Sequence, residues 1–197
     1  MIILASNNEK KIKELKNILN RKDVFSLKDI DFKIDIEEFG VTFEQNALIK
    51  AQAIADIYPN DTIIADDSGL LIETLNNTPG VYSARYAFDP DNKISQDQLN
   101  IDKVIKNMKN KDNRNASFKT VICLIHNNEI PIFFEGKVDG VILKKQSGSN
   151  GFGYDPIFSI DGIKSFASLN ESQKDKISHR GKSLNKLKQK LGELCIL

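Results

Sequence analysis

Mostly apolar runs mark the strands that the first half of the chain predicts. Residues 1–5 and 62–66 carry few polar side chains, which is typical of strands covered on both faces of a sheet. Residues 31–36 instead alternate between polar and apolar side chains, the pattern of a strand with one buried face. We therefore expect three strands before residue 67.

Helices are predicted wherever apolar side chains recur every three or four positions. Four segments have this spacing: one that begins after a cap at Asn7 or Asn8, and then Thr42 to about Tyr58, Ser95 to Met108, and Ser183 to Leu194. Pro59 is expected to end the second of them. The first half of the chain thus alternates strands and helices, as α/β proteins do.

The second half adds a different pattern. Residues 117–126 and 130–136 predict a hairpin that turns at Asn127-Asn128, and a further strand is predicted from Val138 to Leu143. Residues 147–156 are rich in glycine and predict a loop. The expected fold is an α/β domain with a mixed sheet flanked by helices, spanning residues 1–197 without a linker.

Composition narrows the class of protein. The chain has 197 residues, 40% of them hydrophobic and 28% charged, which suits one globular domain. Its net charge of +1 gives no reason to expect nucleic acid as a partner, and no apolar run reaches the about 20 residues of a membrane span. Cys123 and Cys195 have neither metal-site spacing nor a disulfide framework. A cytoplasmic location is therefore predicted.

Asp66 and Asp67 directly follow an apolar run and precede Ser68-Gly69. This pattern predicts that the strand ends there and that both acids lie where the sheet meets solvent, the edge at which α/β proteins bind ligands. Burial of an unpaired carboxylate costs roughly several kcal/mol, so two neighbouring acids indicate a bound cation or proton transfer. The alternative is a solvated turn, and this segment alone does not decide between them.

The residues after the first strand form a second candidate: Ser6, Asn7, Asn8, Glu9, Lys10 and Lys11. A strand-to-helix turn presents free N–H groups and the positive end of a helix dipole, which suit phosphate, and a lysine adds a point charge. The turn is not a glycine-rich nucleotide loop. On these residues alone an asparagine cap beside solvated lysines is favoured.

Glu37 and Glu38 follow the alternating segment. Mg²⁺ takes one or two protein carboxylates and completes its shell with water and phosphate oxygens. Glu37 and Asp67 together fit that requirement if the fold brings them together. A solvated pair of acids is the more common outcome for such a segment.

Two further candidates lie in the second half. Phe152 stands between Gly151 and Gly153, so its ring can stack on a ligand or fill a tight turn, and Asp155 precedes Pro156. Lys174 and the segment Ser178–Gly181 place cations and a hydroxyl just before a helix, where they can contact a base or phosphate or serve as cap and surface residues.

No serine or cysteine stands in a nucleophile's setting that the sequence identifies, so covalent catalysis is not expected. Acids for a metal, cations for phosphate and an aromatic ring for a base together indicate a nucleotide hydrolase.

In this order the segments resemble the inosine triphosphate pyrophosphatases, also described as XTP/dITP pyrophosphatases. The resemblance rests on six collinear motifs: Leu4–Asn8, Gly40–Phe43 with Asn46-Ala47, Ala65–Leu70, Pro79–Tyr86, Gly151–Phe158 and Ser178–Gly181. Together they cover nearly the whole chain. The resemblance implies hydrolysis at the α-phosphorus of ITP, dITP or XTP, giving the monophosphate and pyrophosphate.

The resemblance also implies roles for residues of the phosphate end. Asp67 would accept a proton from water, and Glu37 and Asp67 would hold Mg²⁺. The segment Ser6 to Lys11 would cradle the triphosphate, with Lys11 as the phosphate-binding lysine. Ser68 would contact the substrate.

For the base end, the resemblance implies that Phe152 stacks on the purine. The other residues placed near the base are Gly153, Tyr154, Asp155, Lys174, His179 and Arg180. Polar groups that match the 6-oxo edge would meet the 6-amino group of adenine with a mismatch.

The family further implies a homodimer with an elongated mixed sheet and a substrate groove between two lobes. Gln45 departs from the family, which has an acid directly before Asn46-Ala47, and this affects the expected Mg²⁺ affinity. Two alternatives remain open: a pyrophosphatase of other modified nucleotides, and a nucleotide-binding regulator without turnover.

Overall fold

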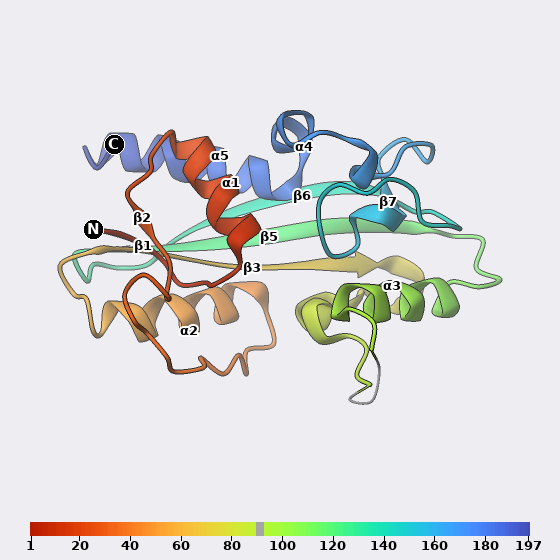
Figure 1. Ribbon diagram of the computed structural model, residues 1–197, viewed down its shortest axis with the longest axis horizontal. Coiled ribbons are helices and arrows are strands. Elements are labelled where there is room, and N and C mark those ends of the chain that lie inside the picture. Colours follow the sequence, from red (N-terminus) through yellow and green to blue (C-terminus); the bar gives the residue numbers. More distant parts are fainter. Residues whose placement is uncertain (90–92) are drawn as a thin grey trace. The chain divides into compact units, whose positions relative to one another are not determined.

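The computed structural model describes residues 1–89 and 93–197 and contains helices packed on a mixed β-sheet (Figure 1). Its strands are β1 (Ile2–Leu4), β2 (Val24–Phe25), β3 (Thr62–Ile72), β4 (Thr78–Pro79), β5 (Asn115–His126), β6 (Ile132–Ile142) and β7 (Phe158–Ser159). They are arranged in the order β2-β1-β3-β5-β6-β7, and β4 pairs with β3. Because β1 is parallel to β2 and β3 while β4 is antiparallel to β3, the predicted mixed sheet is confirmed.

The helices agree with the predicted spacing, with shifted ends. They are α1 (Glu9–Leu19), α2 (Phe43–Ala55), α3 (Gln96–Asn107), α4 (Glu171–Ile177) and α5 (His179–Glu193), together with the short 3-10 helices η1 (Glu73–Leu75), η2 (Gly80–Arg85), η3 (Asp155–Ile157) and η4 (Phe166–Ser168). Helix α4 was not predicted, and α5 begins four residues before the predicted Ser183. Across the described residues, none of the helices has the length and apolar character to span a bilayer.

The chain divides into two compact units. Unit 1 comprises residues 1–67, 120–136 and 180–197, and unit 2 comprises residues 68–119 and 137–179. The assignment of residues 1–197 to one pyrophosphatase domain stays a prediction.

In unit 1 both faces of the sheet are covered. Buried residues of α1 and α5, such as Leu15 and Leu187, pack on one face against Ile64 of β3. Ala47 and Ala51 of α2 pack on the other face. The sheet of this unit therefore has an apolar layer on each side, which matches the nearly unbroken apolar run of β1.

Unit 2 has its own core, in which aromatic rings pack closely. The ring of Phe118 on β5 lies 4.4 Å from Phe158 and 6.0 Å from Phe166, centroid to centroid. Apolar residues of α3, including Ile101 and Val104, belong to the same cluster. This core supports the segments that follow β6, where the candidate base-binding residues lie.

The predicted strand at 31–36 is wrong. These residues form no ladder, and the strand beside β1 is β2, in the register Ile2↔Val24 and Ile3↔Phe25. Phe32 and Ile36 pack against the core on the α2 side, whereas Ile34 is 70% exposed. The alternating pattern therefore belongs to a loop that lies on the core, a case that periodicity alone does not separate from a strand.

Two long strands also differ from expectation. β3 does not end at the acids but continues to Ile72, so Asp66 and Asp67 lie inside the strand. The segments predicted as two strands, 130–136 and 138–143, form one strand, β6. The predicted turn after β5 is confirmed, because Asn127 and Asn128 both adopt positive φ.

Candidate active site

Asp66 and Asp67 project to opposite faces of the sheet, because successive side chains of a strand alternate. Asp66 forms ion pairs with Lys11 of α1 (2.6 Å) and Arg180 of α5 (2.7 Å). Asp67 accepts a hydrogen bond from Asn46 of α2 (3.1 Å), on the other face. The two acids therefore do not form one paired site, and each has its own chemistry.

The sheet has an open position beside these acids because β1 ends there, whereas β3 continues past them. β1 pairs with β3 only as far as Leu4 opposite Ile64. Beyond that point, the described part of the chain places no parallel strand beside Ala65 to Asp67 on the β1 side. A ligand site at the carboxyl end of a parallel strand thus remains available at Asp66 and Asp67.

Asp67 lies in an environment suited to a proton acceptor. It is 7% exposed, and burial raises the pKa of its carboxyl group, with a further contribution from the charge of Glu38. The charge of Lys50 and the hydrogen bond from Asn46 oppose this rise without cancelling it. The result is a carboxylate of increased basicity.

Asn46 holds Asp67 and a loop together. Its side-chain nitrogen donates to Asp67, and its Oδ1 accepts from the backbone N–H of Gly40 (2.8 Å). The Asn46 side chain is fully buried. The loop that carries Glu37 and Glu38 is thereby fixed relative to Asp67.

The structure brings Glu38, rather than Glu37, into contact with the other charges of this site. Glu38 pairs with Lys50 of α2 (3.2 Å), and its charge acts on Asp67. Glu37 is exposed. Among residues 1–89 and 93–197, no group of three or more His, Cys, Asp or Glu side chains is arranged to hold a metal ion.

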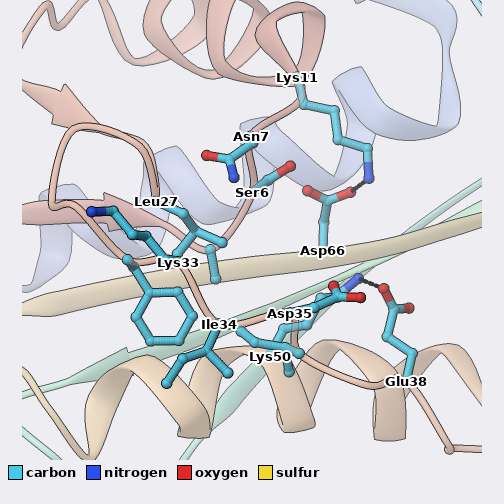
Figure 2. A pocket seen from close by; sticks show the side chains of 13 residues that line it. Ser6, Asn7, Lys11, Leu27, Lys33, Ile34, Asp35, Glu38, Lys50 and Asp66 are labelled. Atoms are coloured by element: carbon cyan, nitrogen blue, oxygen red, sulfur yellow. Dashed lines mark hydrogen bonds and ion pairs between the residues drawn. The ribbon is translucent and has the colours of Figure 1, made fainter.

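A cavity of about 540 Å³ opens beside these residues within unit 1 (Figure 2). Its lining consists of Ala5, Ser6, Asn7, Lys11, Leu27, Phe32, Lys33, Ile34, Asp35, Ile36, Glu38, Lys50 and Asp66. Figure 2 shows the Lys11–Asp66 and Lys50–Glu38 pairs on different sides of this cavity. Three lysines and three acids therefore surround a space large enough for a triphosphate.

The turn from β1 to α1 is built by its own polar side chains. Asn8 caps α1, accepting from the N–H groups of Lys10 (3.0 Å) and Lys11 (3.2 Å). Ser6 Oγ accepts from Asn8 N–H (3.1 Å), and Asn7 Oδ1 accepts from Lys28 N–H (2.8 Å). The structural alternative for Asn8 is thus confirmed.

This capping directs Lys11 toward the cavity. Glu9 and Lys10 are exposed, whereas the Lys11 side chain is 18% exposed and lines the cavity. Burial lowers the pKa of the Lys11 ammonium group, and the charge of Asp66 opposes this effect.

Arg180 is engaged within unit 1. Its Nε pairs with Glu14 of α1 (2.6 Å) and its Nη1 pairs with Asp66, while its side chain is 4% exposed. Arg180 was predicted to lie near the base, and Glu14 was not singled out by the sequence. Because α1 and α5 lie on the same face of the sheet, this pairing is a direct result of the fold.

The candidate base-binding residues of unit 2 are organised by Asp155. Its Oδ2 accepts from the backbone N–H of Phe152 (2.9 Å) and pairs with Lys174 Nζ (2.6 Å). Lys174 Nζ lies 4.7 Å from the centroid of the Phe152 ring. Asp155 and Lys174 are buried and Phe152 is half-buried, so the structure holds the Phe152 ring against a cation.

The neighbours of Phe152 have structural contacts of their own. Gly153 donates its N–H to Asp97 (2.8 Å), and the Tyr154 hydroxyl donates to the carbonyl of Ser83 (2.7 Å). The His179 ring stacks on Phe118 at 4.6 Å and an angle of 17°. Ser68, next to Asp67 in the chain, is half-buried.

Replacing Gly151 with alanine is expected to disrupt this loop. Gly151 has φ +77°, and an added Cβ would approach Asp155 Oδ2 to 2.0 Å. Both effects act against the Asp155–Phe152 contact, so we expect a loss of about 1–3 kcal/mol in the free energy of unfolding. Urea unfolding of the variant tests this. Gly192, with open space around its Cβ position, provides the control Gly192→Ala.

Sequence reasoning missed Asn46 and Lys50 as parts of the site, and from the pair Glu37 and Glu38 it favoured Glu37, whereas Glu38 makes the contacts. A usable signal was present, because Thr42 and Gln45 form a capping box that fixes the start of α2. Asn46 and Lys50 are four residues apart and therefore share one face of that helix. Gln45 accepts from the N–H of Val41 (2.8 Å), so its side chain serves the cap.

The chain is similar to known proteins over nearly its whole length. The model of the Ham1 family matches residues 2–190. A dITP/XTP pyrophosphatase of Leuconostoc mesenteroides is 45% identical over 197 residues, and one of Bacillus subtilis is 45% identical over 194 residues, with 96% of each chain covered in both cases. The solved structure of the Staphylococcus aureus Ham1 protein is 40% identical and gives a TM-score of 0.85, with 98% of each chain covered.

These matches extend over almost the whole chain and confirm the resemblance that the six motifs indicated. The chain therefore belongs to the Ham1 family.

Proposed function

We propose that this protein hydrolyses dITP, XTP and ITP to the monophosphate and pyrophosphate. The observation that carries the proposal is the near full-length similarity to dITP/XTP pyrophosphatases, together with a buried Asp67 of raised pKa near a cavity lined by lysines. A nucleotide hydrolase requires a proton acceptor and cations for phosphate, and unit 1 contains both kinds of group.

In the proposed reaction, Asp67 accepts a proton from the attacking water. The water oxygen forms a bond to the α-phosphorus while the bond from that phosphorus to the bridging oxygen breaks, and pyrophosphate leaves. The raised pKa of Asp67 favours proton acceptance once the carboxyl group is ionised. Lys11 and Lys50, which line the cavity, would offset the charge of the phosphates.

The donor set of unit 1 fits Mg²⁺. Asp67 and the Glu37-Glu38 segment supply hard carboxylate oxygens, and a divalent cation would offset the charge of Glu38, which contributes to the raised pKa of Asp67. We propose that Asp67 holds the ion with Glu37, as the resemblance implies, or with Glu38, which the fold places closer to the charged groups. When bound, Mg²⁺ would neutralise charge on the leaving pyrophosphate.

We propose that the residues of unit 2 bind the purine. The Phe152 side chain would stack on the purine, and Asp155 and Lys174 would hold Phe152 in place. A polar mismatch costs about 1–3 kcal/mol per buried unpaired group, so two such contacts give about 10²–10⁴-fold selectivity against ATP. Arg180 is engaged by Asp66 and Glu14, which favours a positioning role for it over direct contact with the base.

The remaining parts of the proposal rest on the resemblance: a homodimer, a cytoplasmic location, and a substrate groove. Cys123 and Cys195 are free, which is compatible with a reducing compartment. Hydrolysis of other modified nucleotides and binding without turnover are the competing functions.

Pyrophosphate release from dITP, XTP, ITP, GTP and ATP, measured with Mg²⁺ and with EDTA, tests the proposal. We expect metal-dependent turnover of the first three substrates and at least about 10²-fold lower kcat/KM for ATP. Equal turnover of all five would contradict the base-reading roles. No turnover of any of the five by folded protein would favour the regulator.

A further inference from the structure

A chain of four charged side chains in unit 1, with buried Asp66 and Arg180 at its centre, ends at the wall of the cavity. Glu14 pairs with Arg180 (2.6 Å), Arg180 pairs with Asp66 (2.7 Å), and Asp66 pairs with Lys11 (2.6 Å). The four charges sum to zero. Asp66 and Lys11 line the cavity, whereas Glu14 and Arg180 are not part of its lining.

The two ends of this chain are joined on one helix. Lys11 and Glu14 are three residues apart on α1 and therefore lie on the same face. Arg180 also donates from Nη2 to the backbone carbonyl of Lys11 (3.4 Å). One guanidinium thus contacts α1 at two points and β3 at one, so its position fixes where Asp66 meets Lys11.

Arg180 depends on the two acids for its own position. It is the second residue of α5, where the helix dipole disfavours a cation. Its side chain is 4% exposed, so its charge requires carboxylate partners. If Glu14 lost its charge, Asp66 would be the carboxylate left paired with the guanidinium among the described residues, and it would be drawn from Lys11 toward Arg180.

We propose that Glu14 is a positioning residue for phosphate binding: through Arg180 and Asp66 it fixes the Lys11 ammonium group at the cavity wall. The inference rests on the proposed function for the identity of the phosphate ligand. Glu14 would thus affect phosphate binding although it does not line the cavity. Arg180 would transmit this effect, because it pairs with both Glu14 and Asp66. Figure 2 shows the Lys11–Asp66 pair, the end of this series of ion pairs that lies at the cavity.

Inorganic tripolyphosphate is the probe for the test, because its binding requires neither a base nor turnover. Calorimetric Kd values are compared for wild type, Glu14→Gln, Lys11→Ala and the double variant. We expect Glu14→Gln to weaken binding by about five- to tenfold, and to have little further effect once Lys11 is absent. Glu193→Gln is the matched control, because Glu193 pairs with Lys190 on the exposed side of α5 and its variant should bind as wild type does.

An unchanged Kd in Glu14→Gln would overturn the inference. It would also be overturned if Glu14→Gln weakened binding equally in the wild-type and the Lys11→Ala background, because that result indicates a general structural effect. Absence of tripolyphosphate binding by wild type would overturn it as well. If Glu14→Gln does not fold, Glu14→Asp retains the charge but withdraws it from Arg180, and it should produce a smaller weakening that also disappears without Lys11.

The failure of the proposed function is a separate result. Wild-type protein that binds tripolyphosphate in a Glu14- and Lys11-dependent manner, but releases no pyrophosphate from dITP, XTP or ITP, would remove the proposed reaction. The positioning role would then stand for a phosphate-binding site of another activity.

Discussion

The variant Asp67→Asn is expected to lower kcat for dITP by about 10²–10⁴-fold, because an amide cannot accept the proton of the attacking water. The substitution preserves the size of the side chain and its place opposite Asn46. Binding of inorganic tripolyphosphate should change by only a few-fold, since Lys11 is held by Asp66 on the other face of β3. Steady-state kinetics and calorimetry on the same preparation separate the two effects.

Asp102→Asn is the control for this substitution. Asp102 is exposed on α3, where it accepts a hydrogen bond from Gln98 (2.7 Å). Its variant should keep wild-type turnover. Full turnover by Asp67→Asn would exclude Asp67 as the proton acceptor and transfer that role to another carboxylate of unit 1, of which Glu38 is the nearest candidate by its charge effect on Asp67.

The variant Asp155→Asn is expected to reduce the free energy of unfolding by about 3 kcal/mol, because it leaves the charge of buried Lys174 without its carboxylate partner. The amide oxygen can still accept from the N–H of Phe152, so the change isolates the lost charge. Urea unfolding at neutral pH measures the loss. KM for dITP should rise as well, since the Lys174 contact with the Phe152 ring depends on the same pair.

Asp139→Asn removes the charge of an ion pair that is open to solvent. Lys137 and Asp139 are separated by 2.8 Å, with side chains 48% and 76% exposed. Solvent screens such a pair, so the change should be within about 0.5 kcal/mol. Equal losses for Asp155→Asn and Asp139→Asn would mean that burial does not strengthen the Asp155–Lys174 pair.

The fold was predictable to the extent that apolar spacing and helix caps determine local structure. Asn8 and Thr42 cap α1 and α2 as the sequence suggests, and Ser95, the predicted start of the third helix, caps α3. The failures are tertiary. β2 has only two residues and yet pairs with β1, whereas the longer alternating segment 31–36 pairs with no strand.

The site was predictable as a set of residue types but not as a set of contacts. Asp66, Lys11 and Arg180 lie far apart in the sequence, and their pairing depends on α1 and α5 sharing one face of the sheet. The motifs do not predict these ion pairs, because a charged residue in a motif can contact a ligand just as well as another charged residue of the protein. Glu14 lacks any motif, so only the three-dimensional arrangement reveals it.

Side chains of β3 alternate between the two faces of the sheet, so the register of β3 decides which contacts Asp66 makes and which Asp67 makes. β3 pairs with β1 at Thr62, Ile63 and Ile64, and this pairing sets which acid meets the cations and which meets Asn46. Insertion or deletion of one residue between Ile64 and Asp66 would exchange the two faces. Such a chain would keep every charged residue and the same net charge. It would nevertheless place Asp67, the proposed proton acceptor, among the salt bridges, so an inventory of candidate active-site residues does not by itself identify a working member of this family.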